Sequence, residues 1–213
     1  MARKETDDLI RALAQGLKPV RVLRSPKVRA SGWLTAVFLI LGLFVWFKAD
    51  LPSFAARFSE PRMGLQCAAI LLTGISAVMA AFYLSVPGRS ALWRYLPLPF
   101  LALWIGTSGL GCFKYGLGLG PAGSRLGLSS HCFVFIVMVS IPLMIFLYVV
   151  LRRSRPLEPL VVSVTAALGA SALAAFTLQF FHPFDTTWVD LSVHMAAVIA
   201  MISVSTRVRA ALR

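Results

Sequence analysis

Residues 132–181 read CFVFIVMVSIPLMIFLYVVLRRSRPLEPLVVSVTAALGASALAAFTLQFF, two long apolar runs separated by a short basic turn. A helix needs about 20 predominantly apolar residues to cross the hydrocarbon core of a bilayer. The runs 132–151 and 157–181 both reach this length, whereas the arginines between them are too polar to enter lipid. This stretch therefore predicts two membrane-spanning helices joined by a turn at the membrane surface.

The whole chain has the composition of a membrane protein. Of its 213 residues, 58% are hydrophobic and 14% are charged, whereas soluble domains carry roughly 25% charged residues. This excludes a soluble globular domain, and so apolar a chain also does not stay solvated as a disordered one. Four further runs are long enough or nearly long enough to span, at 32–47, 64–86, 95–113 and 186–206.

The predicted fold is all-α, a polytopic membrane protein with six transmembrane helices and a short cytoplasmic N-terminal amphipathic helix. The corresponding domains are a cytoplasmic segment (1–31), a transmembrane domain (32–206) and a basic tail (207–213). Trp33 and Trp46 fall near the two ends of the first span, where an aromatic belt would place them. Gly169, Ala170 and Ser171 give the fifth span a small-residue face suited to close helix packing.

The basic residues predict the orientation of this bundle. The formal net charge is +13, and 16 of the 21 lysines and arginines fall in the two termini and the loops on their side. Five fall on the opposite side. Because positive charge is enriched in cytoplasmic loops, both termini are predicted to be cytoplasmic. The same residues explain the high charge without direct nucleic-acid binding.

The N-terminal segment contains a predicted amphipathic helix. Thr6 is expected to cap a helix from Asp7 to Gln15, with Asp7 and Asp8 complementing the helix dipole. Its apolar stripe consists of Leu9, Ile10, Leu13 and Leu17. Such a helix lies on the anionic inner leaflet or docks into a groove on a cytosolic partner, and periodicity alone does not distinguish the two.

Two cysteines are predicted to reach the outer face. Cys112 ends the third span and Cys132 begins the fourth, and the connection between them is rich in glycine. Three interpretations fit: a structural disulfide, a reactive thiol pair that acts as a sensor, or a soft-metal site completed by His131 and His182. Cys67, within the second span, is expected to be a packing residue.

The sixth span carries two ionisable residues in an otherwise apolar stretch. Asp190 and His194 are four residues apart and therefore share one helical face. They form either a polar clamp that fixes helix packing or a relay for protons or a signal. Before this span, His182 and Pro183 end the fifth helix, and Asp185 is expected to cap the sixth.

The ordered set of short motifs resembles a bacterial family. The motifs are TDDLIRALA (6–14), VPGRS (86–90), LGC (110–112), HC (131–132), LRR (151–153) and HPFD (182–185). Together they resemble the NrsF-like family of six-span negative regulators, membrane anti-sigma factors for extracytoplasmic-function sigma factors. The resemblance covers nearly the whole chain.

The resemblance implies a non-enzymatic regulator of the bacterial inner membrane whose partners are a sigma factor and the lipid bilayer. It implies that the cytoplasmic N-terminal segment holds the sigma factor, and that Cys112 and Cys132 sense heavy metals or oxidative stress and trigger release. No resident cofactor is implied, only transient metal binding. By position, the sigma-contacting segment centres on Asp7, Asp8, Leu9, Ile10 and Leu13.

Two other function classes fit the sequence less well. A membrane thiol oxidoreductase would also use outer-face cysteines, but its chemistry normally needs a closely spaced pair and the sequence has no CxxC. A small cation permease would use Asp190 and His194 as its pathway, but no inverted repeat is visible. Phosphate-binding P-loops, nucleophile elbows and HExxH motifs are also missing from the sequence.

Overall fold

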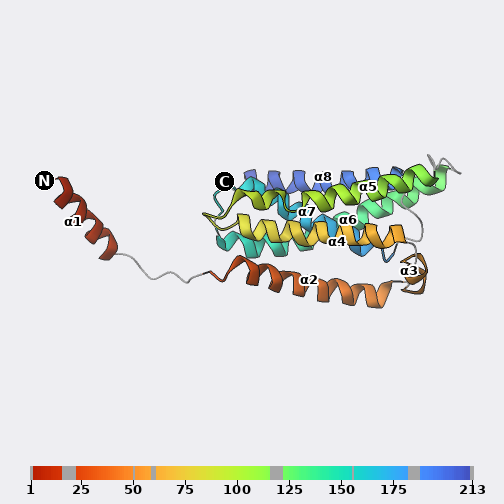
Figure 1. Ribbon diagram of the computed structural model, residues 1–213, viewed down its shortest axis with the longest axis horizontal. Helices are drawn as coiled ribbons and strands as arrows, with labels where there is room; N and C mark the ends of the chain where they lie inside the picture. Colours follow the sequence, from red (N-terminus) through yellow and green to blue (C-terminus); the bar gives the residue numbers. More distant parts are fainter. Residues whose placement is uncertain are drawn as a thin grey trace.

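The computed structural model describes residues 2–15, 23–49, 51–58, 61–115, 122–154, 156–181 and 188–211. Within these ranges every regular element is a helix and there is no strand, so the all-α prediction is confirmed for the described part of the chain. Figure 1 shows the first helix, α1, apart from a bundle of long helices that run back and forth. The start of α2 and the end of α8 lie at the same end of this bundle.

Four helices are long and apolar enough to cross a bilayer, and they match the predicted first, second, fourth and fifth spans. They are α2 (Pro26–Lys48), α4 (Pro61–Leu84), α6 (Ala122–Leu151) and α7 (Pro159–Leu178). Their length and composition are compatible with a membrane protein.

The predicted third and sixth spans are helical but do not reach this standard in the described residues. The third corresponds to α5 (Leu98–Tyr115), which starts only after the 3-10 helix η1 (Ala91–Tyr95). The sixth corresponds to α8 (Trp188–Ala211), in which the apolar part is the short stretch Met195–Val204. The count supported by length and composition is therefore four, not the predicted six.

Helix α7 is the central helix of the bundle. In its most apolar window 78% of the residues are buried, compared with 22% in α2, which lies at the periphery. The predicted small-residue face is confirmed, since Gly169, Ala170 and Ser171 are all buried, and Gly169 packs against α4. Several buried hydroxyls donate to a carbonyl of their own helix; for example, Ser171 donates to the Ala167 carbonyl at 2.7 Å.

The outer surface of the bundle is apolar. Large side chains point outward along α2 and α6, including Leu39, Ile40, Leu43, Trp46, Phe47, Val134, Met138, Ile141 and Ile145. Monomeric soluble proteins rarely expose apolar patches of this extent. The surface is therefore compatible with lipid contact.

Two local features differ from the sequence-based expectations. Trp33 is only 2% exposed and lies against Phe146 with ring centroids 5.8 Å apart, so it is a core residue and not an interfacial anchor. It lies about two helical turns inside α2, on the face that packs on the bundle. The short helix α3 (Leu51–Phe58) was not predicted, and its Phe54 stacks on Phe180 with centroids 4.3 Å apart.

Candidate functional site

Helix α1 (Ala2–Gln15) is longer than predicted. It begins at Ala2 and carries Glu5 in its first turn, so Thr6 lies inside the helix and is not its cap. The additional turn is favoured by Arg3, Lys4 and Glu5, which are good helix formers. Leu17, the last residue of the predicted stripe, lies outside the described residues.

The apolar stripe of α1 is fully on the surface. Leu9, Ile10 and Leu13 are 60%, 57% and 64% exposed, and Asp7 and Asp8 are exposed beside them. Figure 1 shows the helix projecting away from the bundle. The predicted amphipathic helix is therefore present, and its apolar face is not used in packing against the described bundle.

The chain enters the bundle through a well-defined helix start at α2. Ser25 caps α2 by accepting a hydrogen bond from the Val28 backbone N–H at 3.4 Å, and Pro26 occupies the first turn. Proline is well tolerated there because its missing N–H would have no helical partner. Helix α2 thus starts six residues before the predicted span.

Arg29, one turn into α2, connects this peripheral helix to α4 and to the end of α6. Its guanidinium donates from Nη1 to the Ser154 hydroxyl and from Nη2 to the Val150 carbonyl, both at 2.7 Å. The same group lies over the Phe82 ring of α4, with Cζ 5.4 Å from the centroid. A planar guanidinium can make these contacts together, which a lysine ammonium cannot.

Sequence reasoning counted Arg29 only as one of many positive charges and missed this role. The two residues that accept its hydrogen bonds lie more than 100 positions away along the chain. The one available signal was its place a single turn before an uninterrupted apolar run. That position is also common for residues that simply reach into the lipid headgroups.

A second set of contacts ties two connections together at the same end of the bundle. Arg94, in η1, donates from Nη2 to the Glu158 carboxylate at 2.9 Å, and Glu158 directly precedes α7. Beside them Trp93 stacks on Tyr83, with ring centroids 3.8 Å apart. We call this end, which carries Arg29, Arg89, Arg94, Arg152 and Arg153, the arginine-rich end.

The connection between the two predicted sensor cysteines is shorter than expected. Residues 122–131 were predicted to be a flexible loop but belong to α6, because leucine, arginine and serine extend a helix that the following apolar run stabilises. Cys132 therefore lies ten residues inside α6, about 15 Å along the helix axis from its start.

Cys132 is a core residue in this arrangement. It is 5% exposed and belongs to a buried cluster with Trp104 of α5, Ala197 of α8 and residues of α4 and α7. Its neighbour His131 is exposed. Cys112 lies in α5, but its side chain is outside the described residues, and so is all of His182. The disulfide, metal and sensor interpretations thus stay predictions.

The other polar predictions also fall on side chains that the structure does not describe. The backbone of α8 includes both Asp190 and His194, four residues apart on the same helix. Asp185 lies outside the described residues. Among the side chains that are described, no three histidine, cysteine or acidic residues form a group that would hold a metal ion.

No curated protein and no solved structure matches the chain. A family model does match, and it covers residues 13–210, which is the helical bundle apart from the last residue of α8, together with the last turn of α1. Its description is negative regulator of sigma F. With most of its length matched, the chain belongs to the NrsF family.

Proposed function

We propose that this chain is a membrane-bound anti-sigma factor that holds an extracytoplasmic-function sigma factor through α1. Membership of the NrsF family supports negative regulation of a sigma factor. The observation that carries the proposal is the exposed stripe of Leu9, Ile10 and Leu13 on a helix that projects from the bundle. An isolated helix of 14 residues is marginally stable in water and gains most from a surface that covers its apolar face.

The charges of α1 favour a protein partner over a lipid surface. Helices that lie on anionic membranes usually carry lysine and arginine on their polar face. Helix α1 has no such excess, because its three acidic residues, Glu5, Asp7 and Asp8, balance its three basic ones, Arg3, Lys4 and Arg11. Carboxylates beside the stripe would be repelled by an anionic leaflet. They suit a basic groove on a folded partner.

The mechanism is sequestration followed by release. A sigma factor held at the membrane by α1 does not engage RNA polymerase. Release requires a second state of the bundle that binds the partner less tightly. Helix α2 is the element that joins the N-terminal segment to the bundle, and Arg29 fixes the start of α2 against α4 and α6. A change in the bundle that loosens this contact would alter how α1 is presented.

The signal is proposed to enter through Cys112 and Cys132. Support comes from the place of Cys132, whose buried cluster joins residues of α4 to α8. A thiol in such a cluster acts through packing, because oxidation or metal binding there would force the helices around it to move apart.

The proposed placement is the inner membrane, with six spans and both termini in the cytoplasm. The start of α2 and the end of α8 share the arginine-rich end of the bundle, as that orientation requires. Helix α5 would then be a span packed against α4, and α8, whose described apolar part is short, would be a span packed against α6 and α7.

The test is co-purification of the sigma factor with full-length protein in which Leu9 and Leu13 are both replaced by glutamate. Each glutamate would bury a charge in the interface, and together they should lower affinity roughly 100-fold or more. Arg11→Glu is the control, because it changes the charge by the same amount on the opposite face of α1. Unchanged co-purification of the double variant would place the sigma site elsewhere.

A further inference from the structure

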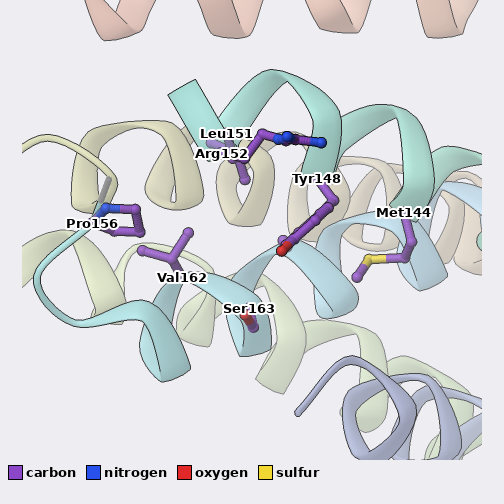
Figure 2. A pocket seen from close by; sticks show the side chains of 8 residues that line it. Met144, Tyr148, Leu151, Arg152, Pro156, Val162 and Ser163 are labelled. Carbon is purple, nitrogen blue, oxygen red and sulfur yellow. The ribbon is translucent and has the colours of Figure 1, made fainter. Parts of the chain in front are cut away.

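A groove opens between α6 and α7 at the arginine-rich end of the bundle. Figure 2 shows Met144 and Tyr148 of α6 extending toward Val162 and Ser163 of α7. Ala166, one turn further along α7, also lines the groove. The groove has a volume of about 190 Å³. Arg152 lines the end at which α6 passes into the 3-10 helix η2 (Arg152–Ser154).

The interior of the groove is apolar. Its side chains are mostly aliphatic. Two lining residues carry a hydroxyl: Tyr148, and Ser163, which already donates to the Pro159 carbonyl at 2.9 Å. A sugar, a nucleotide or another polar ligand needs several convergent polar groups, and the groove has too few of them. It suits a hydrocarbon chain.

The mouth of the groove is cationic. Arg152 lines the groove there, and Arg153 is the next residue of η2; both are exposed, and within the described part of the chain no carboxylate pairs with either of them. Glu158, the acidic residue of the α6–α7 connection, forms an ion pair with Arg94. An anion placed at the mouth would meet the charge of Arg152 directly, with Arg153 adjacent in the chain and no competing carboxylate.

We propose that this groove binds one acyl chain of an anionic phospholipid, with the phosphate of the headgroup at Arg152 and attracted also by the neighbouring charge of Arg153. The inference rests on the proposed membrane placement and is independent of sigma binding. From Met144 to Arg152 the helix rises about 12 Å, a depth that suits the first part of an acyl chain. Exposed apolar residues of α6 next to the groove, Ile145 and Val149, continue the surface into the surrounding lipid.

The experiment compares two phospholipids with the same acyl chains, one with a net negative headgroup and one with a zwitterionic headgroup. Full-length protein purified in mild detergent is mixed with phosphatidylglycerol or phosphatidylcholine carrying identical acyl chains, and bound lipid is counted by native mass spectrometry. Phosphatidylglycerol is expected to be retained preferentially, by roughly fivefold for each arginine that contacts it. The variant with Arg152→Gln and Arg153→Gln should lose this preference.

Two further variants distinguish lipid binding in the groove from general attraction to the positive surface charge. Ala166→Leu fills part of the groove and should reduce retention of both lipids while leaving the arginines in place. Arg89→Gln removes an exposed arginine of the same end outside the groove and should leave retention unchanged. If the double variant does not fold, the single variant Arg152→Gln takes its place in the lipid comparison. Its thermal unfolding is measured to show that it is folded.

The proposal is overturned if wild-type protein retains both lipids equally, or if Arg89→Gln lowers retention as much as the double variant does. It is also overturned if glycerol 3-phosphate displaces the bound lipid at the same concentration as intact phosphatidylglycerol. In that case the site recognises a soluble phosphate and the acyl chain contributes nothing.

Discussion

Gly74 on α4 faces Gly169 on α7 so closely that a Cβ atom added to Gly169 would lie 3.3 Å from the carbonyl oxygen of Gly74. The same Cβ would lie 3.0 Å from the backbone nitrogen of Val78. Backbone atoms of a packed helix have little room to move, so α4 and α7 can approach this closely only if position 169 has no side chain. Close approach of this kind strengthens packing between helices in lipid.

Gly169→Ala is therefore expected to destabilise the bundle by about 1–3 kcal/mol, the usual cost of overpacking a core. Chemical unfolding in detergent, followed by circular dichroism, measures the change. Gly106→Ala on α5 is the matched control, because no described atom lies within 4 Å of its added Cβ. There the substitution should be neutral or stabilising, since alanine is the better helix former. Equal stability of the two variants would contradict the close packing at Gly169.

Arg29→Ala should release the start of α2. It removes two hydrogen bonds made by a charged group, each worth about 1.5–3 kcal/mol, and the contact with the Phe82 ring. Hydrogen exchange at the first turns of α2 is expected to increase, with little change at the centre of α7. Arg29→Lys should restore the protection only in part, because an ammonium cannot reproduce the planar pair of donors.

Lys27→Ala provides the control for this experiment, as Lys27 is exposed two residues earlier on the same helix. If both substitutions increase exchange equally, the loss of positive charge near the helix start is the cause, and the contacts of Arg29 to α6 do not hold α2 in place.

The sequence predicted the helices well where one physical signal was strong. The fourth span was expected to end at Leu151, and α6 ends there, because arginines follow and cannot enter lipid. The small-residue face of the fifth span was also correct, since three small residues in succession inside an apolar run have few uses besides close packing.

The sequence-based predictions were wrong where tertiary contacts determine where a helix starts or where a side chain lies. The start of α6 was placed ten residues too late, because glycines in 122–131 were taken as loop residues. Trp33 was assigned to the interface because a single tryptophan near the end of a span fits both an aromatic belt and a core. The contacts of Arg29 depend on residues more than 100 positions away, for which one sequence carries no signal.

The orientation of the bundle is predicted to place the arginine-rich end in the cytoplasm. Compartment-sensitive reporters fused after Arg213 and within the α4–η1 connection at Gly88 should both report the cytoplasm, because basic loops are retained there. A reporter in the connection 116–121 should report the opposite compartment. The same signal from all three fusions would rule out an odd number of crossings between these points, and with it the six-span arrangement.

The last prediction concerns the proposed sensor cysteines. Cys112→Ser and Cys132→Ser should each leave the protein in the membrane and its sigma factor silenced, yet abolish the response to soft metals such as cadmium or to thiol oxidants. Serine is a gentle replacement at position 132, because its hydroxyl can donate to a carbonyl of the preceding turn, as the buried Ser171 does. Cys67→Ser is the matched control, since Cys67 is 3% exposed and Cys132 is 5% exposed. Expression of a sigma-dependent reporter gene measures both silencing and response.

A normal response in both Cys112→Ser and Cys132→Ser would remove these cysteines from the mechanism. Loss of silencing without stress in Cys112→Ser and Cys132→Ser, but not in Cys67→Ser, would instead assign the pair a structural role, because a broken disulfide destabilises the bundle as a whole.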